Sequence, residues 1–352
     1  MNTIVLTGGG TAGHVTPHIA LIPSLKENGW DIRYIGSYQG IEKELITKED
    51  IPYYGISSGK LRRYMSMQNL KDPFKVVKGF FDALKILKKL KPKVVFSKGG
   101  YVTVPVVLAA NALKIPVIIH ESDITPGLAN KMAMKGAKII CVNFEETLQY
   151  VGDKGILTGT PIRKELFEGD KEKGNRLCNF KAKRPTLLMM GGSLGSVKIN
   201  LVLRKALPVL LEKFNIIHIC GKGNRDTSLL ELEGYKQFEY VGKELPHLFA
   251  ITDIMLSRAG ANALSEIVAL NIPSLLIPLS AAASRGDQIL NAQSMKNKGY
   301  SEVLLEEQLS YETLIKKVEF IYKNKSQYKA AMQKDPQIKA IDKIIGAIGK
   351  YC

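Results

Sequence analysis

Two glycine-rich turns, each placed directly after a short apolar run, carry the residues whose types and spacing point most clearly to chemistry. Residues 8–14 read Gly-Gly-Gly-Thr-Ala-Gly-His, and residues 191–195 read Gly-Gly-Ser-Leu-Gly. When such a turn opens a helix, its backbone N–H groups can hold a phosphate or pyrophosphate. The imidazole of His14 can accept a proton or bind a ligand, and the hydroxyl of Ser193 can donate to a phosphate oxygen. The turns therefore predict a phosphorylated ligand.

Each of these features also has a structural interpretation. The glycines can serve a tight turn for steric reasons alone, His14 can be a helix-cap or packing residue, and Ser193 can cap the following helix. Gly8, Gly10 and Gly13 also match the spacing of a dinucleotide fingerprint. That fingerprint needs an acidic residue after the next strand, but this position reads Ile-Gly-Ser at 35–37. A phosphate cradle is therefore favoured over an NAD site.

Short apolar runs alternate with amphipathic segments, and these elements must position the turns. The strands expected in the first half are Thr3–Leu6, Ile32–Ile35, Val94–Phe96, Val117–Ile119 and Ile139–Val142, with helices at Pro17–Asn28 and Phe74–Leu90. Those expected in the second half are Thr186–Met190, Ile216–Cys220, Phe238–Val241, Ile254–Leu256 and Ser274–Ile277, with a helix from near Lys198. The alternation predicts an α/β protein with doubly wound parallel sheets.

The plan of strand, glycine turn and helix occurs twice, which predicts two Rossmann-like domains facing each other across a cleft. The chain has 352 residues, enough for two domains. Residues 164–185 are charged and weakly periodic, and we expect them to be a linker. In open α/β sheets, ligands bind beyond the carboxyl ends of the strands, so the site is expected there.

Composition limits the partners. The hydrophobic share of 45% and charged share of 24% are typical of a soluble globular protein, and a formal net charge of +17 predicts an anionic partner. That partner can be nucleic acid, a phosphorylated substrate or a membrane surface. Four scattered cysteines predict reduced thiols rather than a metal site. No run of about 20 apolar residues occurs, so we expect any membrane contact to be peripheral.

Much of the positive charge lies in one region, which we call the basic segment, from Lys60 to Lys98. It holds twelve basic residues against Asp72 and Asp82, a net charge of +10. Its apolar residues recur every three or four positions and predict a basic amphipathic helix with Phe80 or Phe81 exposed. An ordinary surface helix is the alternative. Nucleic-acid binding is disfavoured because no helix-turn-helix, RNP or zinc spacing accompanies the charge.

Further polar motifs follow the expected strands. They are Ser97–Val102, His120–Asp123, Thr125–Lys131, Gly159–Arg163, Ser257–Asn262 with Ser265-Glu266, and Arg285–Gln288 with Asn291-Ala292. Together with the opening Gly-Gly-Thr-x-Gly-His, this ordered set resembles the MurG family from about Thr7 to Ala292. These are peripheral N-acetylglucosaminyltransferases that make lipid II in peptidoglycan synthesis.

The resemblance implies a GT-B fold and transfer of GlcNAc from UDP-GlcNAc to the C4 hydroxyl of MurNAc in lipid I, with inversion at the anomeric carbon. UDP-GlcNAc is a co-substrate, and neither a cofactor nor an essential metal is expected. The sequence accordingly has no Asp-x-Asp pair for a metal-bound nucleotide. UDP-GlcNAc 2-epimerases share the GT-B architecture and are the alternative. An epimerase would consume UDP-GlcNAc without a lipid acceptor.

The resemblance also assigns residues to the donor. Glu266 matches the carboxylate that holds the ribose hydroxyls, although a glutamate early in a helix also favours the helix dipole. Asp287 and Gln288 match the pair that recognises the sugar, where many relatives have two glutamines. The remaining implied donor residues are Thr11, Gly13, Arg163, Ser193, Gly260 and Ala261.

For the acceptor, the resemblance implies a pyrophosphate site in the first domain, with the undecaprenyl chain left in the bilayer. Ser122-Asp123 replaces the Gln-Asn of other members. The catalytic base is left between His14 and Glu121. The implied acceptor residues are Gly9, Gly10, His14, Gly99, Gly100, Tyr101, Asp123 and Asn130.

The expected domains follow from this assignment. Residues 1–162 should bind lipid I and the membrane, residues 163–334 should bind UDP-GlcNAc, and residues 335–352 should form a helix returning to the first domain. The implied partners are lipid I, an anionic membrane surface, and proteins of cell-wall synthesis and division, with no nucleic acid. The implied location is peripheral, on the cytoplasmic face of the cell membrane, in a pathway that supports cell shape and division.

Overall fold

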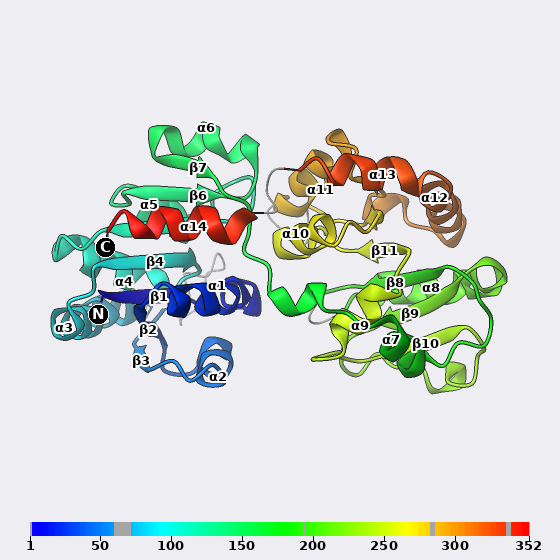
Figure 1. Cartoon of the computed structure of the whole chain (residues 1–352), viewed down its shortest axis with the longest axis horizontal. Helices are drawn as coiled ribbons and strands as arrows, with labels where there is room; N and C mark the ends of the chain where they lie inside the picture. The colour runs from blue at the N-terminus through cyan, green and yellow to red at the C-terminus, as the bar shows by residue number, and fades with distance from the viewer. Residues whose placement is uncertain (1, 60–71, 193–194, 282–285, 336–338, 352) are drawn as a thin grey trace. The chain divides into compact units, whose positions relative to one another are not determined.

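The computed structural model describes residues 2–59, 72–192, 195–281, 286–335 and 339–351 (Figure 1). The chain forms two compact units. Unit 1 comprises Met1–Arg163 with Gln337–Cys352, and unit 2 comprises Lys164–Pro336. Within the described residues, no helix is both long enough and apolar enough to cross a membrane.

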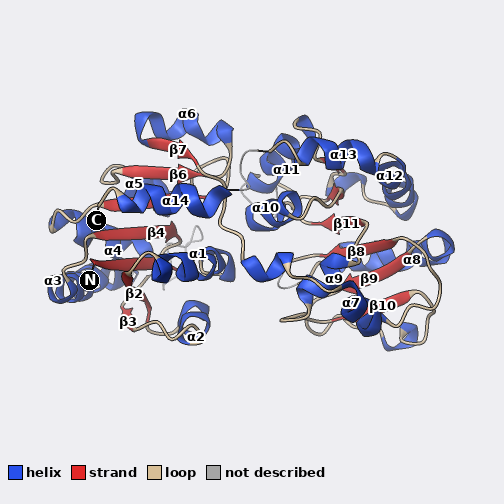
Figure 2. Ribbon diagram, in the orientation of Figure 1, coloured by secondary structure: helices blue, strands red, loops and turns tan. Residues whose placement is uncertain are grey.

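Unit 1 is built on a parallel sheet of seven strands in the order β3-β2-β1-β4-β5-β6-β7 (Figure 2). The strands are β1 Asn2–Gly8, β2 Trp30–Ser37, β3 Tyr53–Ile56, β4 Val94–Gly99, β5 Val117–Glu121, β6 Ile139–Val142 and β7 Gly155–Leu157. All five strands expected for this half are confirmed. The sequence did not reveal β3 and β7, because both are short edge strands that contain glycine.

Two helical layers cover this sheet, as expected for a doubly wound fold. One core contains side chains of α1 Thr16–Glu27, α2 Ile41–Thr47 and α14 Ala340–Gly349 with strand residues such as Ile4. The other contains side chains of α3 Asp72–Leu90, α4 Thr103–Ala112, α5 Leu128–Met134 and α6 Leu148–Val151 with strand residues such as Val5. Ile344 and Ile348 of α14 pack into the first core beside α1, which places the end of the chain in unit 1.

Unit 2 repeats the plan with a parallel sheet of six strands in the order β10-β9-β8-β11-β12-β13. The strands are β8 Thr186–Met190, β9 Asn215–Ile219, β10 Tyr235–Phe238, β11 Ile254–Ser257, β12 Ser274–Leu276 and β13 Ser301–Val303. The helices are α7 Lys171–Cys178, α8 Val197–Lys213, α9 Leu245–Ala250, α10 Ala261–Ala269, α11 Asp287–Asn297, α12 Tyr311–Lys323 and α13 Lys325–Met332. The expectation of two Rossmann-like α/β sheets is confirmed.

Two expectations for the second half were wrong in detail. The strand expected at Phe238–Val241 lies at Tyr235–Phe238 instead. The strand was placed too late because Gln237, a polar residue, is buried within it. The side-chain amide of Gln237 makes hydrogen bonds with Asp226 and Arg204 in place of apolar contacts. The expected linker at 164–185 contains α7. Asp170 caps this helix by accepting from the N–H groups of Glu172 and Lys173. The short strand β13 was not predicted either.

Candidate functional site

In unit 1, two glycine turns, residues 8–14 after β1 and residues 97–101 at the end of β4, meet at the point where the strand order reverses, between β1 and β4. Gly10, Gly99 and Gly100 all have positive φ, near +90°. A Cβ atom at Gly10 would lie 2.6 Å from the Tyr101 ring, and one at Gly100 would clash with the carbonyl oxygen of Gly9. Glycine is therefore required for the two turns to touch. The structure thus brings the predicted residues 9–14 and 99–101 together at the carboxyl end of the sheet.

A buried carboxylate that the sequence analysis did not identify organises this first turn. Glu42 has no exposed surface and accepts from the N–H groups of Gly10 and Ser37, both at 3.2 Å, and from the Ser37 hydroxyl. Burial raises the pKa of Tyr34 and of Tyr101, and the nearby Glu42 carboxylate raises both further. One N–H group of the turn is thus already bound by the protein's own anion. A ligand must use the others.

His14 ends the short 3-10 helix Ala12–His14, two residues before the start of α1. Its Nδ1 lies 3.0 Å from the hydroxyl oxygen of Thr11, and its side chain is partly exposed. If Nδ1–H donates to Thr11, the lone pair at Nε2 becomes the basic site of the ring. Thr11 can therefore select the tautomer that a general base requires.

Glu121, the second candidate base, is bound on both oxygens. It is buried and accepts from the N–H groups of Asp123 and Gly127, both at 3.0 Å, and from the Asn130 amide at 2.8 Å. Burial raises its pKa, the nearby Asp123 adds to the rise, and these hydrogen bonds oppose it. The contacts close the loop that leads into α5. Glu121 and Asn130 therefore stabilise the loop that carries Asp123.

In unit 2, three residues expected to bind the donor, Gly260, Ala261 and Glu266, lie in or directly before α10, next to the point where the strand order reverses, between β8 and β11. Gly260 is the N-cap of α10, so the first amides of that helix, starting at Ala261, face the carboxyl end of the sheet. Glu266 lies at the sixth position of α10 and is half-buried. The helix dipole acts mainly on the first turn. This position therefore weakens the dipole interpretation of Glu266.

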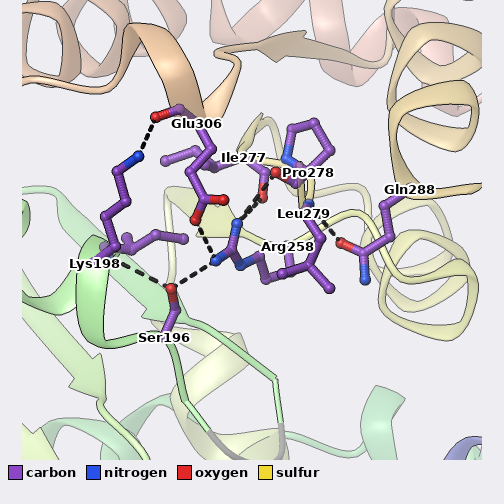
Figure 3. Close-up of polar contacts among 9 residues, drawn as sticks. Ser196, Lys198, Arg258, Ile277, Pro278, Leu279, Gln288 and Glu306 are labelled. Atoms are coloured by element: carbon purple, nitrogen blue, oxygen red, sulfur yellow. Dashed lines mark hydrogen bonds and ion pairs between the residues drawn. The ribbon is translucent and has the colours of Figure 1, made fainter. Parts of the chain in front are cut away.

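One arginine joins four loops at this edge of unit 2 (Figure 3). Arg258, directly after β11, donates to the carbonyl oxygens of Ile277 and Pro278, both at 3.2 Å. It also donates to the Ser196 hydroxyl at 2.8 Å and pairs with Glu306 at 2.7 Å. The loops after β8, β11, β12 and β13 are thereby fixed to one another. We call Arg258 and these partners the Arg258 hub. The partners are far from Arg258 in the sequence, and they were not predicted.

Ser196, a member of the hub, lies directly after the second glycine turn at 191–195. Ser196 is the N-cap of α8 and accepts from the N–H of Ile199 at 3.5 Å. The capping role considered for Ser193 therefore belongs to Ser196. Ser193 lies outside the described residues.

The loop after β12 carries the residues expected to recognise the sugar. Asp287 and Gln288 are the first two residues of α11, after Gly286 with φ +82°. The side-chain oxygen of Gln288 accepts from the N–H of Leu279 at 3.1 Å. This bond orients the amide, so its NH2 group is the part that remains to donate. Three further residues expected to bind the donor, Thr11, Gly13 and Arg163, belong to unit 1, and Arg163 is half-buried where the chain leaves that unit.

Across the described parts of the chain, no three His, Cys, Asp or Glu side chains are grouped so that they could hold a metal ion. The polar groups at the two sheet edges include helix-start amides, hydroxyls, imidazoles, carboxylates and the Arg258 guanidinium. These groups are suited to binding a nucleotide-linked sugar and a second phosphorylated substrate, and to moving a proton.

Two such sheets are the architecture of GT-B glycosyltransferases, and the matching family models assign the chain to that class. Residues 4–142 match the glycosyltransferase family 28 N-terminal domain, and residues 186–346 match the corresponding C-terminal domain. The fold is similar to that of Acinetobacter baumannii MurG, with a TM-score of 0.80, 24% identity and coverage of 99% of this chain and 100% of that one. It is also similar to UDP-GlcNAc 2-epimerase from Neisseria meningitidis, with a TM-score of 0.71, 15% identity and coverage of 99% and 100%.

Sequence relatives are more specific than these folds. A UDP-N-acetylglucosamine–N-acetylmuramyl-(pentapeptide) pyrophosphoryl-undecaprenol N-acetylglucosamine transferase from Lachnoclostridium phytofermentans is 60% identical, over 99% of this chain and 98% of its own. One of the same name from Clostridium perfringens strain SM101 is 56% identical, over 99% and 98%. The chain belongs to this family, the MurG family.

Proposed function

We propose that the chain transfers GlcNAc from UDP-GlcNAc to the C4 hydroxyl of MurNAc in lipid I, forming lipid II with inversion at the anomeric carbon. The observation that carries this proposal is the 60% identity, over nearly the whole chain, to a relative named for that transfer. UDP-GlcNAc is the co-substrate, and lipid I is the acceptor.

Incubation with radiolabelled UDP-GlcNAc and a lipid I analogue tests the activity. We expect label to enter the lipid product and UDP to be released in equal amount. Omitting the analogue should stop consumption of UDP-GlcNAc. Consumption without an acceptor would instead support the epimerase, for which the similarity is at the level of fold, with 15% identity.

The proposed reaction assigns separate tasks to the two units. In unit 1, the turn at 9–14 and the loop at 97–101 receive the acceptor's pyrophosphate, and His14 Nε2 takes the proton of the attacking hydroxyl. In unit 2, the amides at the start of α10 face the donor, with Glu266 accepting from the ribose hydroxyls. The NH2 group of Gln288 then donates to the sugar, because its oxygen is held by Leu279. No step in this scheme requires a metal ion.

Replacing Glu266 with alanine is expected to weaken UDP binding by roughly ten- to a hundredfold. A hydrogen bond to a charged group contributes about 1.5–3 kcal/mol, and the ribose would lose its charged acceptor. Titration calorimetry with UDP measures the change, and Glu212→Ala in the same unit is the control, because Glu212 is exposed near the C-terminal end of α8, away from the glycine turn at its start. UDP binding as tight as in the parent protein would remove Glu266 from the donor site.

We further propose that α3 holds the protein on the cytoplasmic face of the cell membrane, where the acceptor is anchored. Phe74, Val77 and Phe81 are 78%, 56% and 61% exposed and recur at helical spacing, so they form one apolar stripe. Exposed lysines accompany this stripe at positions 75, 78, 85, 88 and 89. The opposite side of α3 is in the core through Ala83 and Leu87.

The adjacent residues Phe80 and Phe81 of α3 lie in different environments. Phe81 is exposed, whereas Phe80 packs against the core and contacts the Phe81 ring edge-on at 5.3 Å. The expectation that one of the two would be exposed is confirmed. Lys60, Arg62, Arg63 and Lys71 of the basic segment lie outside the described residues. An amphipathic helix of this kind suits the surface of an anionic bilayer.

Changing Lys85, Lys88 and Lys89 together to glutamate is expected to release the protein from anionic vesicles, because each basic residue near such a surface strengthens binding about fivefold. Co-sedimentation measures this. The matched control changes Lys26, Lys43 and Lys48, which lie in or directly after helices α1 and α2 on the other face of the sheet and alter the net charge equally. Activity on a short-chain, soluble lipid I analogue should persist. Equal sedimentation of both triple variants would exclude α3 as the docking helix.

A further inference from the structure

Lys98 is a buried ammonium group that the proposed transfer does not use. It lies in β4 directly before Gly99, is only 2% exposed, and donates to the hydroxyl of Ser122. A Cβ atom at Gly8 would lie 3.3 Å from the Lys98 Cβ, so the lysine stem packs against the start of the first glycine turn. Burying an ammonium group is costly unless opposite charges are close. The charged groups around Lys98 should therefore explain how its ammonium group is stabilised.

The charged neighbours of Lys98 are two carboxylates, that of Glu121 at the end of β5 and that of Asp123 in the loop after it. Burial lowers the pKa of Lys98 to about 8, and the carboxylates of Glu121 and Asp123 oppose that shift. His18 of α1 and His120 of β5 also face Lys98. Burial and then Lys98 lower the pKa of His18 to about 3, and the same causes hold the pKa of His120 well below its usual value.

Both imidazoles are therefore neutral near pH 7, and the partly exposed His14, which also acts on His18, is the remaining histidine at this edge of unit 1. The local charge is then set by one ammonium and two carboxylates. A further carboxylate, Glu42, binds the turn itself at Gly10.

Such an excess of negative charge is unfavourable next to an anionic ligand. Glu121 cannot be dispensed with, because its oxygens hold the loop at Asp123 and Gly127 and the amide of Asn130. A Cβ atom at Gly99 would lie 3.0 Å from the side chain of Asn130 in α5, so the group bonded to Glu121 lies directly against the 97–101 segment. A cation between the carboxylates and the glycine turns reduces their repulsion of phosphate.

We propose that Lys98 is a positioning residue for the acceptor, whose positive charge offsets Glu121 and Asp123 so that a pyrophosphate can bind at the glycine turns. This inference rests on the proposed function, because it takes lipid I as the ligand of that edge. Lys98 is buried and acts on the pyrophosphate through its charge. Its loss should therefore alter acceptor KM more than kcat, and leave the KM for UDP-GlcNAc unchanged.

The same charge predicts a pH dependence. Below about pH 7 Lys98 is protonated and the offset is complete. As pH rises through about 8 the ammonium loses its proton, the loop becomes more negative by one charge, and acceptor binding weakens. Acceptor KM should therefore rise between pH 7 and pH 9, while the KM for UDP-GlcNAc, which is assigned to unit 2, stays level over that interval.

Steady-state kinetics with a soluble lipid I analogue at pH 6.5–9.5 tests the proposal. For Lys98→Met, which has a similar length and no charge, we expect acceptor KM at pH 7 to rise about tenfold, as for one unit charge removed at roughly 10 Å in an effective dielectric of about 20. The rise above pH 7 should disappear. Lys138→Met, at an exposed lysine before β6, should behave like the parent protein.

A second variant separates charge from packing. Lys98→Met with Asp123→Asn removes one charge of each sign, and its acceptor KM should return close to that of Asp123→Asn alone, so that most of the rise seen in Lys98→Met is reversed. Failure of that rescue would overturn the proposal, as would a parent protein whose acceptor KM is level from pH 7 to pH 9. The second result needs no variant to fold. A parent protein that glycosylates no lipid I analogue would overturn the proposed function itself, and this inference with it.

Discussion

Replacing His14 with alanine is expected to lower kcat by about 10²–10⁴-fold, the contribution typical of a general base. His14 lies at the carboxyl end of the unit 1 sheet, with Nδ1 3.0 Å from the Thr11 hydroxyl oxygen and the ring partly exposed. UDP-GlcNAc affinity should change little, because most of the donor residues, among them Glu266 and Gln288, belong to unit 2. Rapid-quench kinetics with the soluble acceptor and calorimetry with UDP measure the two effects separately.

Two further variants distinguish His14 from its alternative. Thr11→Val removes the hydroxyl that orients the imidazole and should lower kcat by a smaller factor than His14→Ala. Glu121→Gln should mainly destabilise unit 1, because its carboxylate accepts two backbone N–H groups. If His14→Ala keeps most of its kcat while a folded Glu121→Gln loses it, the base is Glu121 and His14 is structural.

The strands were predictable from sequence wherever local pattern and burial coincide. β6, Ile139–Val142, and β8, Thr186–Met190, were predicted at their observed bounds because both are nearly continuous apolar runs between sheet neighbours. β10 was placed three residues late because buried Gln237 interrupts the apolar pattern and is stabilised by Asp226, which is distant in the sequence. A local pattern cannot report such a partner.

The candidate site shows the same division. The turns at 8–14 and 97–101 were recognisable, because glycine is needed where backbone approaches backbone or a ring. Glu42 was missed because a glutamate early in a helix resembles an ordinary dipole residue. The Arg258 hub was missed because Ser196, Ile277 and Glu306 become its neighbours only when four loops meet. The partners of such buried charges are brought together only by the fold, so the sequence alone does not reveal them.

Replacing Arg258 with methionine should destabilise unit 2 by about 3–5 kcal/mol, the cost of leaving one partner of a buried ion pair without the other. Arg258 and Glu306 have side chains only 11% and 12% exposed, so the remaining carboxylate would be largely desolvated. The loops that carry Gly260 and Gln288 would lose their common anchor, and the KM for UDP-GlcNAc should rise below the melting temperature. Calorimetry should show a transition lowered by roughly 10 °C.

The exposed pair Lys213–Glu319 provides the control, because it lies in the same unit with an N···O distance of 2.6 Å but with side chains 58% and 38% exposed. Exposed pairs contribute little to stability, so Lys213→Met should leave the melting temperature almost unchanged. Arg258→Met combined with Glu306→Gln should recover part of the loss, since no buried charge is then left unpaired. If Arg258→Met melts no lower than Lys213→Met, the four loops do not depend on the hub. The order at the donor edge would then have to come from the helix starts alone.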